Sequence, residues 1–227
     1  MVKSSLFFLA FILFLFLKGS GQANLLPLRM WQGKTDSLLV LYISGDGGMN
    51  TFSTGLCSSL ENSGYGVTAI NAKSYFWERK TPEQAAETIN TYLNGKFAKR
   101  KNQQLILAGY SFGADVLPFI INRLPGETRE RIKKVILLSP GTSTDFEIHW
   151  IDMLGEDRKR NMDVISEINK MNVPGTIALF GSDEKEFPLK NIVIRNFKSA
   201  YLPGGHHYEG NIAEVAREMI RCFHSIR

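Results

Sequence analysis

The sequence predicts an α/β fold: a mostly parallel central sheet of about six strands, flanked by helices on both faces. Short apolar runs rich in β-branched residues recur along the chain, at residues 38–43, 67–70, 105–108, 135–138 and 176–180, with a weaker run at 192–194. Continuous runs of this kind are typical of parallel strands that are buried on both faces. Helical patterns separate the runs, and this alternation implies right-handed crossovers between parallel strands.

Two of the other segments carry clear helix signals. Thr81 is a typical N-cap residue and Pro82 suits the first helical position. Apolar residues then follow at four-residue steps, which places them on one face of a helix: Ile89, Leu93 and Phe97. A second helix is predicted near the end of the chain, over residues 209–225.

Residues 1–23 are predicted to be a signal peptide. Lys3 supplies the positive start, residues 6–17 form an uninterrupted apolar run, and residues 21–23 read Gly-Gln-Ala, a small-x-small cleavage pattern. The apolar run is shorter than the ~20 residues of a membrane-spanning helix, so a retained anchor is the weaker alternative. We therefore expect an exported, periplasmic protein with a single domain over residues 24–227.

The charge balance indicates no nucleic-acid partner. Removal of residues 1–23 takes away Lys3 and Lys18 and no acid, so the formal net charge falls from +5 to +3, a mild excess. Basic tracts at residues 96–101 and 158–160 are most simply interpreted as solvated helix ends. Contact of these tracts with an anionic membrane surface is the alternative.

The chain has two cysteines, Cys57 and Cys222. Each falls in a predicted helix that flanks the sheet, and the two helices are expected to lie on the same face. An exported compartment permits a disulfide between them but does not require one. Both states remain open from the sequence.

Residues 109–113 read G-Y-S-F-G and directly follow the apolar run at 105–108. After a buried strand, G-x-S-x-G is typical of a nucleophile elbow, a turn so tight that larger side chains near the serine would collide. Residues 114–117 continue as the first turn of a helix. We therefore interpret Ser111 as a candidate nucleophile; the alternative is a solvated glycine-serine turn.

The loop after the run at 38–43 is rich in glycine: residues 44–48 read S-G-D-G-G. In serine hydrolases with such an elbow, one oxyanion donor comes from an early strand loop and the other follows the nucleophile. The N–H groups of Asp46 and Phe112 are the predicted donors, and Gly47 is a predicted substrate contact. The loop lacks the G-x-G-x-x-G pattern and the P-loop lysine of phosphate-binding loops. A plain glycine turn is the other alternative.

The loop after the run at 176–180 contains the acid candidates, Asp183 and Glu184. In a catalytic triad the acid orients the histidine and stabilises its charged form. The sequence does not separate the two acids, although a G-x-x-acid spacing slightly favours Glu184. A charged surface loop is the alternative for at least some of its acids.

His206 and His207 lie side by side in a glycine-bounded loop before the last predicted helix. The pattern Gly-His-x-aromatic favours His206 as the general base, with His207 as a substrate-contacting neighbour. The chain order serine, acid, histidine is that of the α/β-hydrolase fold. His149 and His224 are interpreted as surface or packing residues. Adjacent histidines rarely bind one metal ion together, so we predict neither a metal nor another cofactor.

The connection over residues 141–172 is long and carries several aromatic and apolar residues between 146 and 155. Long connections in this position often cover an active site. We predict a cap that could receive an acyl or lipid group, with core packing as the alternative.

With these motifs assembled, the chain resembles the VirJ/AcvB family of virulence-associated, exported α/β hydrolases of bacteria. The matching segments are S-G-D-G-G at 44–48, G-Y-S-F-G-A-D-V-L-P at 109–118, D-F-E-I-H at 145–149 and G-G-H-H-Y at 204–208. One departure is Met49, where the family usually carries tryptophan, and it alters the surroundings of the predicted oxyanion loop.

The resemblance implies a serine hydrolase that acts on aminoacylated phosphatidylglycerol, in particular one that releases lysine from lysyl-phosphatidylglycerol at the outer face of the inner membrane. The residues alone predict only an ester hydrolase. The side chains of Asp46 and Asp115 are candidates to attract a cationic aminoacyl group, although an acid at the position of Asp115 is also explained by the helix dipole. Two alternatives remain: a general carboxylesterase or thioesterase, and a non-catalytic periplasmic binding or assembly factor. The sequence identifies no protein partner.

Overall fold

The computed structural model describes residues 25–34, 37–149 and 160–225. They contain a seven-stranded sheet with the strand order β1-β3-β2-β4-β5-β8-β9. The strands are β1 (Leu28–Trp31), β2 (Leu38–Ile43), β3 (Gly66–Ile70), β4 (Gln104–Tyr110), β5 (Ile132–Leu138), β8 (Thr176–Gly181) and β9 (Phe197–Leu202). All neighbouring strands are parallel except β1 and β3. The mostly parallel α/β sheet is therefore confirmed, whereas the predicted signal peptide lies outside the described residues.

The two edge strands are where the sequence-based prediction fails. The weak run at 192–194 is not a strand; it follows a short 3-10 turn, Leu189–Asn191, and the last strand is β9. β9 is mostly exposed or half-buried and β1 is similarly exposed, because each lies at an edge of the sheet. Neither strand therefore carries the continuous apolar run that marks the buried central strands.

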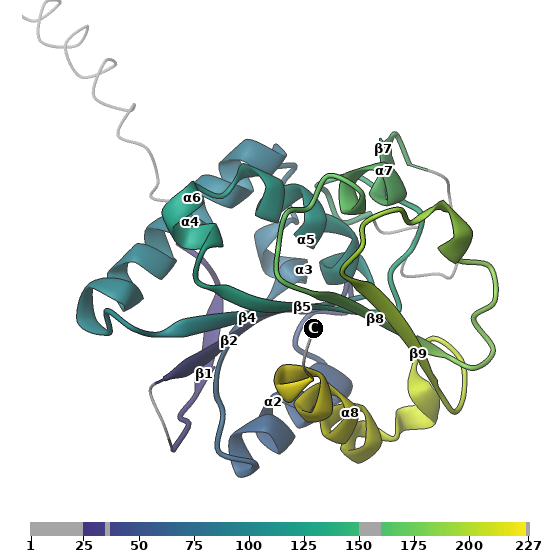
Figure 1. Ribbon diagram of the computed structural model, residues 1–227, viewed down its shortest axis with the longest axis horizontal. Coiled ribbons are helices and arrows are strands. Elements are labelled where there is room, and N and C mark those ends of the chain that lie inside the picture. Colours follow the sequence, from purple (N-terminus) through teal and green to yellow (C-terminus); the bar gives the residue numbers. More distant parts are fainter. Residues whose placement is uncertain (1–24, 35–36, 150–159, 226–227) are drawn as a thin grey trace, which may run out of the picture.

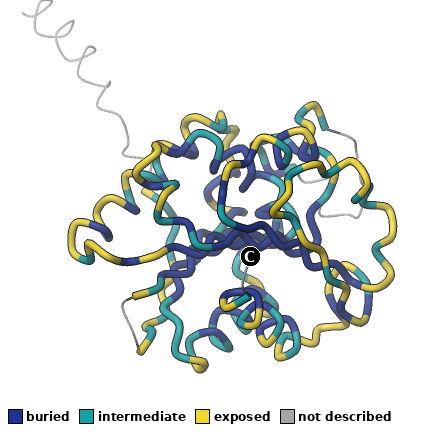
Figure 2. Tube along the Cα trace, viewed as in Figure 1, coloured by how far each residue is buried: buried dark blue, intermediate teal, exposed yellow. Residues whose placement is uncertain are grey.

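Helices cover both faces of the sheet (Figure 1). One face carries α3 (Ala72–Tyr75), α4 (Pro82–Lys99), α5 (Phe112–Arg123), α6 (Gly126–Arg129) and α7 (Val164–Ile168). The other carries α2 (Thr51–Asn62) and α8 (Ile212–His224). Figure 2 shows the buried sheet between helices whose outer sides are exposed.

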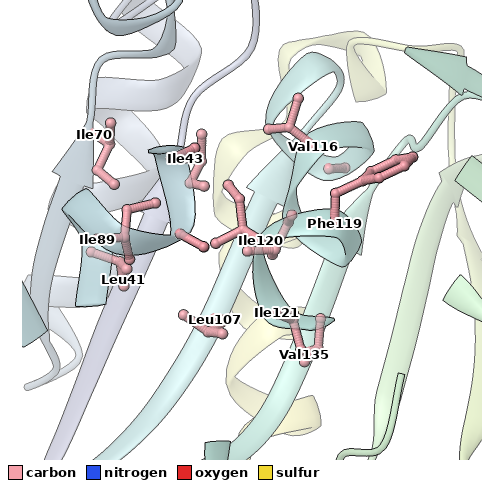
Figure 3. Close-up of a cluster of buried hydrophobic side chains, with 14 of the residues drawn as sticks. Leu41, Ile43, Ile70, Ile89, Leu107, Val116, Phe119, Ile120, Ile121 and Val135 are labelled. Atoms are coloured by element: carbon pink, nitrogen blue, oxygen red, sulfur yellow. The ribbon is translucent and has the colours of Figure 1, made fainter. Parts of the chain in front are cut away.

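Two hydrophobic cores lie on the two faces of the sheet. Along β2, Leu41 and Ile43 join the core beneath α4 and α5, while Val40 and Tyr42 join the core beneath α2 and α8. This division follows from the alternation of side chains along a strand. Figure 3 shows the larger core, where apolar residues of α5 meet those of the central strands.

The helix predicted after Thr81 is confirmed. The Thr81 side chain accepts a hydrogen bond from the Gln84 backbone N–H, and the Gln84 side chain accepts one from the Thr81 backbone N–H. This capping box satisfies two otherwise unpaired donors at the start of α4. The residues at four-residue steps are all buried on the sheet: Ile89, Leu93 and Phe97. The last helix is also confirmed, with α8 beginning slightly later than predicted, after a 3-10 turn at Tyr208–Gly210.

Helices α2 and α8 pack against each other, as predicted, and carry the two cysteines. Cys57 and Cys222 are buried free thiols. Burial raises the pKa of Cys57 to about 12 and that of Cys222 to about 11. Both thiols are therefore protonated at neutral pH and lack the thiolate character that makes a cysteine reactive.

The long connection after β5 is only partly described, because residues 150–159 fall outside the described ranges. It contains a short antiparallel pair, β6 (Ser143–Thr144) with β7 (Met162–Asp163), and α7 follows β7. Phe146 is buried, with ring contacts to Phe76 and Phe119. This aromatic residue of the predicted cap therefore belongs to the core. Among the described residues, none of the helices has the length and apolar character needed to cross a membrane.

Candidate active site

Ser111 lies between the end of β4 and the start of α5, with backbone angles φ 51° and ψ −121°. A positive φ is strained for a residue other than glycine and is typical of functional sites. The flanking glycines explain how the turn closes. A Cβ on Gly109 would collide with the Gly113 carbonyl, and a Cβ on Gly113 would collide with the Ile43 carbonyl. Glycine is therefore required on both sides of the elbow.

The three predicted types of triad residue meet at the carboxyl ends of the strands. His206 Nε2 lies 2.9 Å from Ser111 Oγ, and His206 Nδ1 lies 2.7 Å from Glu184 Oε1. A neutral imidazole that donates Nδ1–H to the carboxylate leaves Nε2 free to accept the serine proton. The arrangement is that of a nucleophile, a general base and an orienting acid.

Asp183 and His207, the other candidates in the two loops, do not join this chain of hydrogen bonds. Asp183 is exposed, and its carboxylate accepts a hydrogen bond from the Ser182 hydroxyl at 3.2 Å. His207 instead places Nδ1 2.6 Å from the Tyr110 hydroxyl. The structure therefore brings Glu184 rather than Asp183, and His206 rather than His207, to Ser111.

The acid loop and the histidine loop are in direct backbone contact. The Ser182 amide donates to the Leu202 carbonyl at 2.7 Å, and the Asp183 amide donates to the Gly204 carbonyl at 3.1 Å. A Cβ on Gly181 would collide with the Gly204 and Gly205 carbonyls. This close approach lets Glu184 reach His206.

The second carboxylate oxygen of Glu184 is held by two hydrogen bonds from the protein. Glu184 Oε2 accepts hydrogen bonds from the Ser139 hydroxyl and from the Gly181 amide, both at 2.7 Å. Burial raises the pKa of Glu184, but the hydrogen bonds from His206, Ser139 and Gly181 outweigh it and leave that pKa below its ordinary value. Glu184 is therefore an anion at neutral pH, as the predicted orienting role requires.

Ser139 and Tyr208 form a buried pair behind the acid. Ser139 follows β5 with a φ of 47°, and its hydroxyl lies 2.8 Å from the Tyr208 hydroxyl. The Tyr208 hydroxyl also lies 2.8 Å from the Leu179 carbonyl oxygen. Because a carboxylate only accepts, the single Ser139 proton is directed to Glu184, and the single Tyr208 proton is shared between the Ser139 oxygen and the Leu179 carbonyl. The pair connects the acid to β8 and to the histidine loop.

Tyr110, the variable residue before the nucleophile, contacts the histidine loop from below. Its hydroxyl donates to the His206 carbonyl at 3.2 Å and lies 2.6 Å from His207 Nδ1. Both hydrogen bonds form together when His207 carries a proton on Nδ1. Burial, followed by the charges of Glu184 and Asp46, raises the pKa of Tyr110, so its phenol stays protonated.

The predicted oxyanion loop lies beside the elbow. A Cβ on Gly45 would lie 3.4 Å from Ser111 Cβ, which shows how closely the loop approaches the serine. The Gly48 amide donates to the Gly45 carbonyl at 2.9 Å and closes a turn around Asp46 and Gly47. Phe112 opens α5, and the first N–H groups of a helix have no partner within it.

Three other acids and histidines considered from the sequence have structural partners: Asp115, His149 and His224. Asp115 accepts a hydrogen bond from the Gly141 amide at 2.6 Å, so its carboxylate fixes the loop after β5. His149 pairs with Asp145 at 2.7 Å, and His224 pairs with the Tyr65 hydroxyl at 2.6 Å. Within the described part of the chain, no three His, Cys, Asp or Glu side chains gather as a metal site would require.

Solved structures share this fold. The lipase-esterase related protein from Clostridium acetobutylicum gives a TM-score of 0.63 at 14% identity, over 86% of this chain and 98% of that one. Est1E from Butyrivibrio proteoclasticus gives 0.57 at 18% identity, over 86% and 92%. The thioesterase domain from the curacin biosynthetic pathway gives 0.57 at 15% identity, over 85% and 94%. These similarities confirm the predicted α/β-hydrolase fold.

Comparison with curated proteins gives no significant match. The family model described as bacterial virulence protein (VirJ), in contrast, matches residues 36–226. That span contains all four segments on which the sequence resemblance rests, together with Ser111, Glu184 and His206. The chain therefore belongs to the VirJ family of bacterial virulence proteins.

Proposed function

We propose that this protein is a serine hydrolase that cleaves carboxylic esters. The observation that carries the proposal is the continuous chain of hydrogen bonds from Ser111 through His206 to Glu184, with separations of 2.9 and 2.7 Å. The strained backbone of Ser111 adds support, because it presents the hydroxyl at the end of β4.

The mechanism follows from these positions. His206 Nε2 accepts the Ser111 proton as Ser111 Oγ attacks the ester carbonyl, and the Glu184 carboxylate stabilises the imidazolium that forms. The N–H groups of Asp46 and Phe112 stabilise the oxyanion of the tetrahedral intermediate. His206 then protonates the leaving alcohol. Water, deprotonated by His206, hydrolyses the acyl-enzyme and regenerates the serine.

We further propose an aminoacylated phospholipid, of the lysyl-phosphatidylglycerol type, as the substrate. Family membership supports this choice, and so does the charge near the nucleophile. Glu184 is hydrogen-bonded to His206, and Asp46 follows Gly45, which approaches Ser111. The charges of both carboxylates help to raise the pKa of Tyr110, the residue before the nucleophile, so the site carries negative charge. This surrounding favours a cationic acyl group, while Gly47 and His207 are exposed nearby as substrate contacts. Each carboxylate accepts a backbone hydrogen bond, Asp46 from Gly47 at 2.8 Å and Asp115 from Gly141 at 2.6 Å. Asp115 is the weaker candidate because it lies in the first turn of α5, where the helix dipole already stabilises an acid.

Access to a lipid substrate goes with the proposed export of the chain through residues 1–23. The described basic tract at residues 96–101 does not support membrane contact at the active site. It connects the end of α4 to the start of β4, whereas Ser111 follows the end of β4. The tract and the nucleophile therefore lie at opposite ends of β4.

A general carboxylesterase or thioesterase is the second candidate. The half-buried Ser111 and the exposed His206 favour it, because a partly open site does not by itself select one acyl group. The third candidate, a non-catalytic periplasmic binding or assembly factor, requires no reactive serine.

Hydrolysis of lysyl-phosphatidylglycerol in vesicles and of a short p-nitrophenyl ester separates these candidates. We expect the wild type to release lysine and Ser111→Ala to lose at least about 1,000-fold in kcat. Glu184→Gln should also lose activity, because His206 loses its orienting carboxylate. Asp183→Asn, its matched control, should retain activity. Activity on the short ester alone rejects the lipid substrate. A wild type that cleaves neither ester, with full biological activity in Ser111→Ala, rejects the enzyme.

A further inference from the structure

The peptide group that carries the proposed oxyanion donor of Asp46 is fixed through its other end. The Gly45 carbonyl oxygen accepts two hydrogen bonds, one from the Ser44 hydroxyl at 3.2 Å and one from the Gly48 amide at 2.9 Å. The Gly45 carbonyl and the Asp46 N–H belong to the same planar peptide unit. In a trans peptide these two groups point in opposite directions, so donors that fix the carbonyl also fix the N–H.

Ser44 is suited to this task because its hydroxyl has one available direction. The side chain is fully buried. Its oxygen accepts a hydrogen bond from the Ala72 amide at 3.0 Å, and its backbone N–H donates to the Ile70 carbonyl at 3.1 Å. With the oxygen occupied by a donor from the segment after β3, the single hydroxyl proton is left for Gly45.

The residue that follows makes this support necessary. Gly45 has no side chain to restrict its backbone, and a Cβ there would fit tightly, 3.3 Å from Tyr110 Cδ1 and 3.4 Å from Ser111 Cβ. A peptide after glycine rotates more freely than one after a larger residue. Glycine therefore lets the loop approach the nucleophile closely but leaves its backbone more flexible. The hydrogen bond from the Ser44 hydroxyl limits this flexibility.

We propose that Ser44 is a positioning residue of the oxyanion hole, which orients the Asp46 N–H through the Gly45–Asp46 peptide. This proposal rests on the hydrolase function proposed above. Ser44 touches neither the substrate nor the reacting atoms. Its contribution is made in the transition state, where the Asp46 N–H meets the developing negative charge.

The test is Ser44→Ala, measured on the full chain with the short p-nitrophenyl ester. Loss of a whole oxyanion donor costs about 100- to 1,000-fold in kcat. A donor that is misaligned rather than removed should cost about 10- to 100-fold, with KM changed less than about threefold. The affinity for a trifluoromethyl ketone, which forms a tetrahedral adduct with Ser111, should fall by a similar factor.

Ser53→Ala is the matched control. Ser53 is equally buried, and its hydroxyl lies 3.0 Å from the Tyr42 hydroxyl, on the α2 side of the sheet. The same truncation there should lower stability to a similar extent without the loss of kcat. Equal kinetic losses in both variants, or unchanged kcat and ketone affinity in Ser44→Ala, overturn the proposal.

A crystal structure of Ser44→Ala supplies a readout that is independent of activity. We expect the Gly45–Asp46 peptide to be rotated or to adopt two orientations, and a peptide that keeps its single orientation also overturns the proposal. If the wild type hydrolyses neither ester and does not react with the ketone, the proposed hydrolase function is wrong. In that case the peptide orientation still decides whether Ser44 fixes the loop.

Discussion

The two halves of the candidate active site are built in different ways. The elbow and the oxyanion loop depend on the backbone: Gly109 and Gly113 have no room for a side chain, and Ser111 has a positive φ. The acid and histidine loops also meet at a glycine with no room for a side chain, Gly181. Their catalytic groups, however, are fixed largely by side-chain hydrogen bonds, from Ser139 to Glu184 and from Tyr110 to the His206 carbonyl. The backbone half should therefore fail abruptly when altered, whereas the side-chain half should lose activity in steps.

Gly109→Ala should have the largest effect. Its new methyl group would collide with the Gly113 carbonyl, a backbone atom that cannot move without distorting the elbow. We expect kcat/KM to fall by at least about 1,000-fold, together with a loss of several kcal/mol of stability, about that of a severe core defect. Ester hydrolysis and urea unfolding measure the two effects.

Gly95→Ala is the control for this substitution. Gly95 lies within α4 and nothing surrounds the position of its absent Cβ. The change should stabilise the protein by about 0.5–1 kcal/mol, since alanine favours helix more than glycine does. Similar losses at both glycines would show that the elbow has no special steric requirement.

Ser139→Ala should reduce activity by about tenfold, the cost of one hydrogen bond to a charged group. Glu184 would keep its contact with His206 but lose a donor to Oε2. Its pKa should therefore rise toward the ordinary value, and the loss of stability on acidification should become shallower than in the wild type. An unchanged slope with lower stability would mean that Ser139 only packs behind the acid.

Tyr110→Phe should have a smaller effect, about threefold to tenfold in kcat, because it removes neutral hydrogen bonds worth about 0.5–1.5 kcal/mol. The variant lacks the hydroxyl that contacts the His206 carbonyl and the His207 ring. Tyr65→Phe is the matched control, since Tyr65 forms a tyrosine–histidine pair of the same length with His224 at the far end of α8. Equal kinetics in the two variants would count against Tyr110 as a support of the histidine loop.

The same difference between the halves explains what could be predicted from the sequence. Backbone requirements leave glycines at fixed spacings, so Ser111 and the loop at 44–48 are recognisable without a structure. The choice of Glu184 over Asp183 depends on which side chain points toward His206, and adjacent residues in a loop give no periodic signal. Ser139 comes from a different part of the chain and has no motif; the only hint is its place after a predicted strand.

The fold shows a similar limit. Strands buried on both faces, such as β4 and β5, contain unbroken apolar runs and were predicted. The edge strands β1 and β9 contact solvent and mix polar with apolar residues. Their pairing with β3 and β8 supplies the order that their own sequences do not show.

The smallest expected effect concerns stability against acid. The pKa of Glu184 is lower in the folded protein than its ordinary value, so the folded state is more stable with Glu184 ionised than with Glu184 protonated. This stabilisation is fully present above the unfolded pKa, about 4.3, and is lost as the pH falls through the folded pKa. Glu184→Gln removes this titration. Urea unfolding between pH 3 and 7 should therefore show a shallower loss of stability on acidification in Glu184→Gln than in the wild type. Identical slopes in wild type and Glu184→Gln would mean that ionisation of Glu184 does not stabilise the folded protein. Glu184 would then serve only to orient His206.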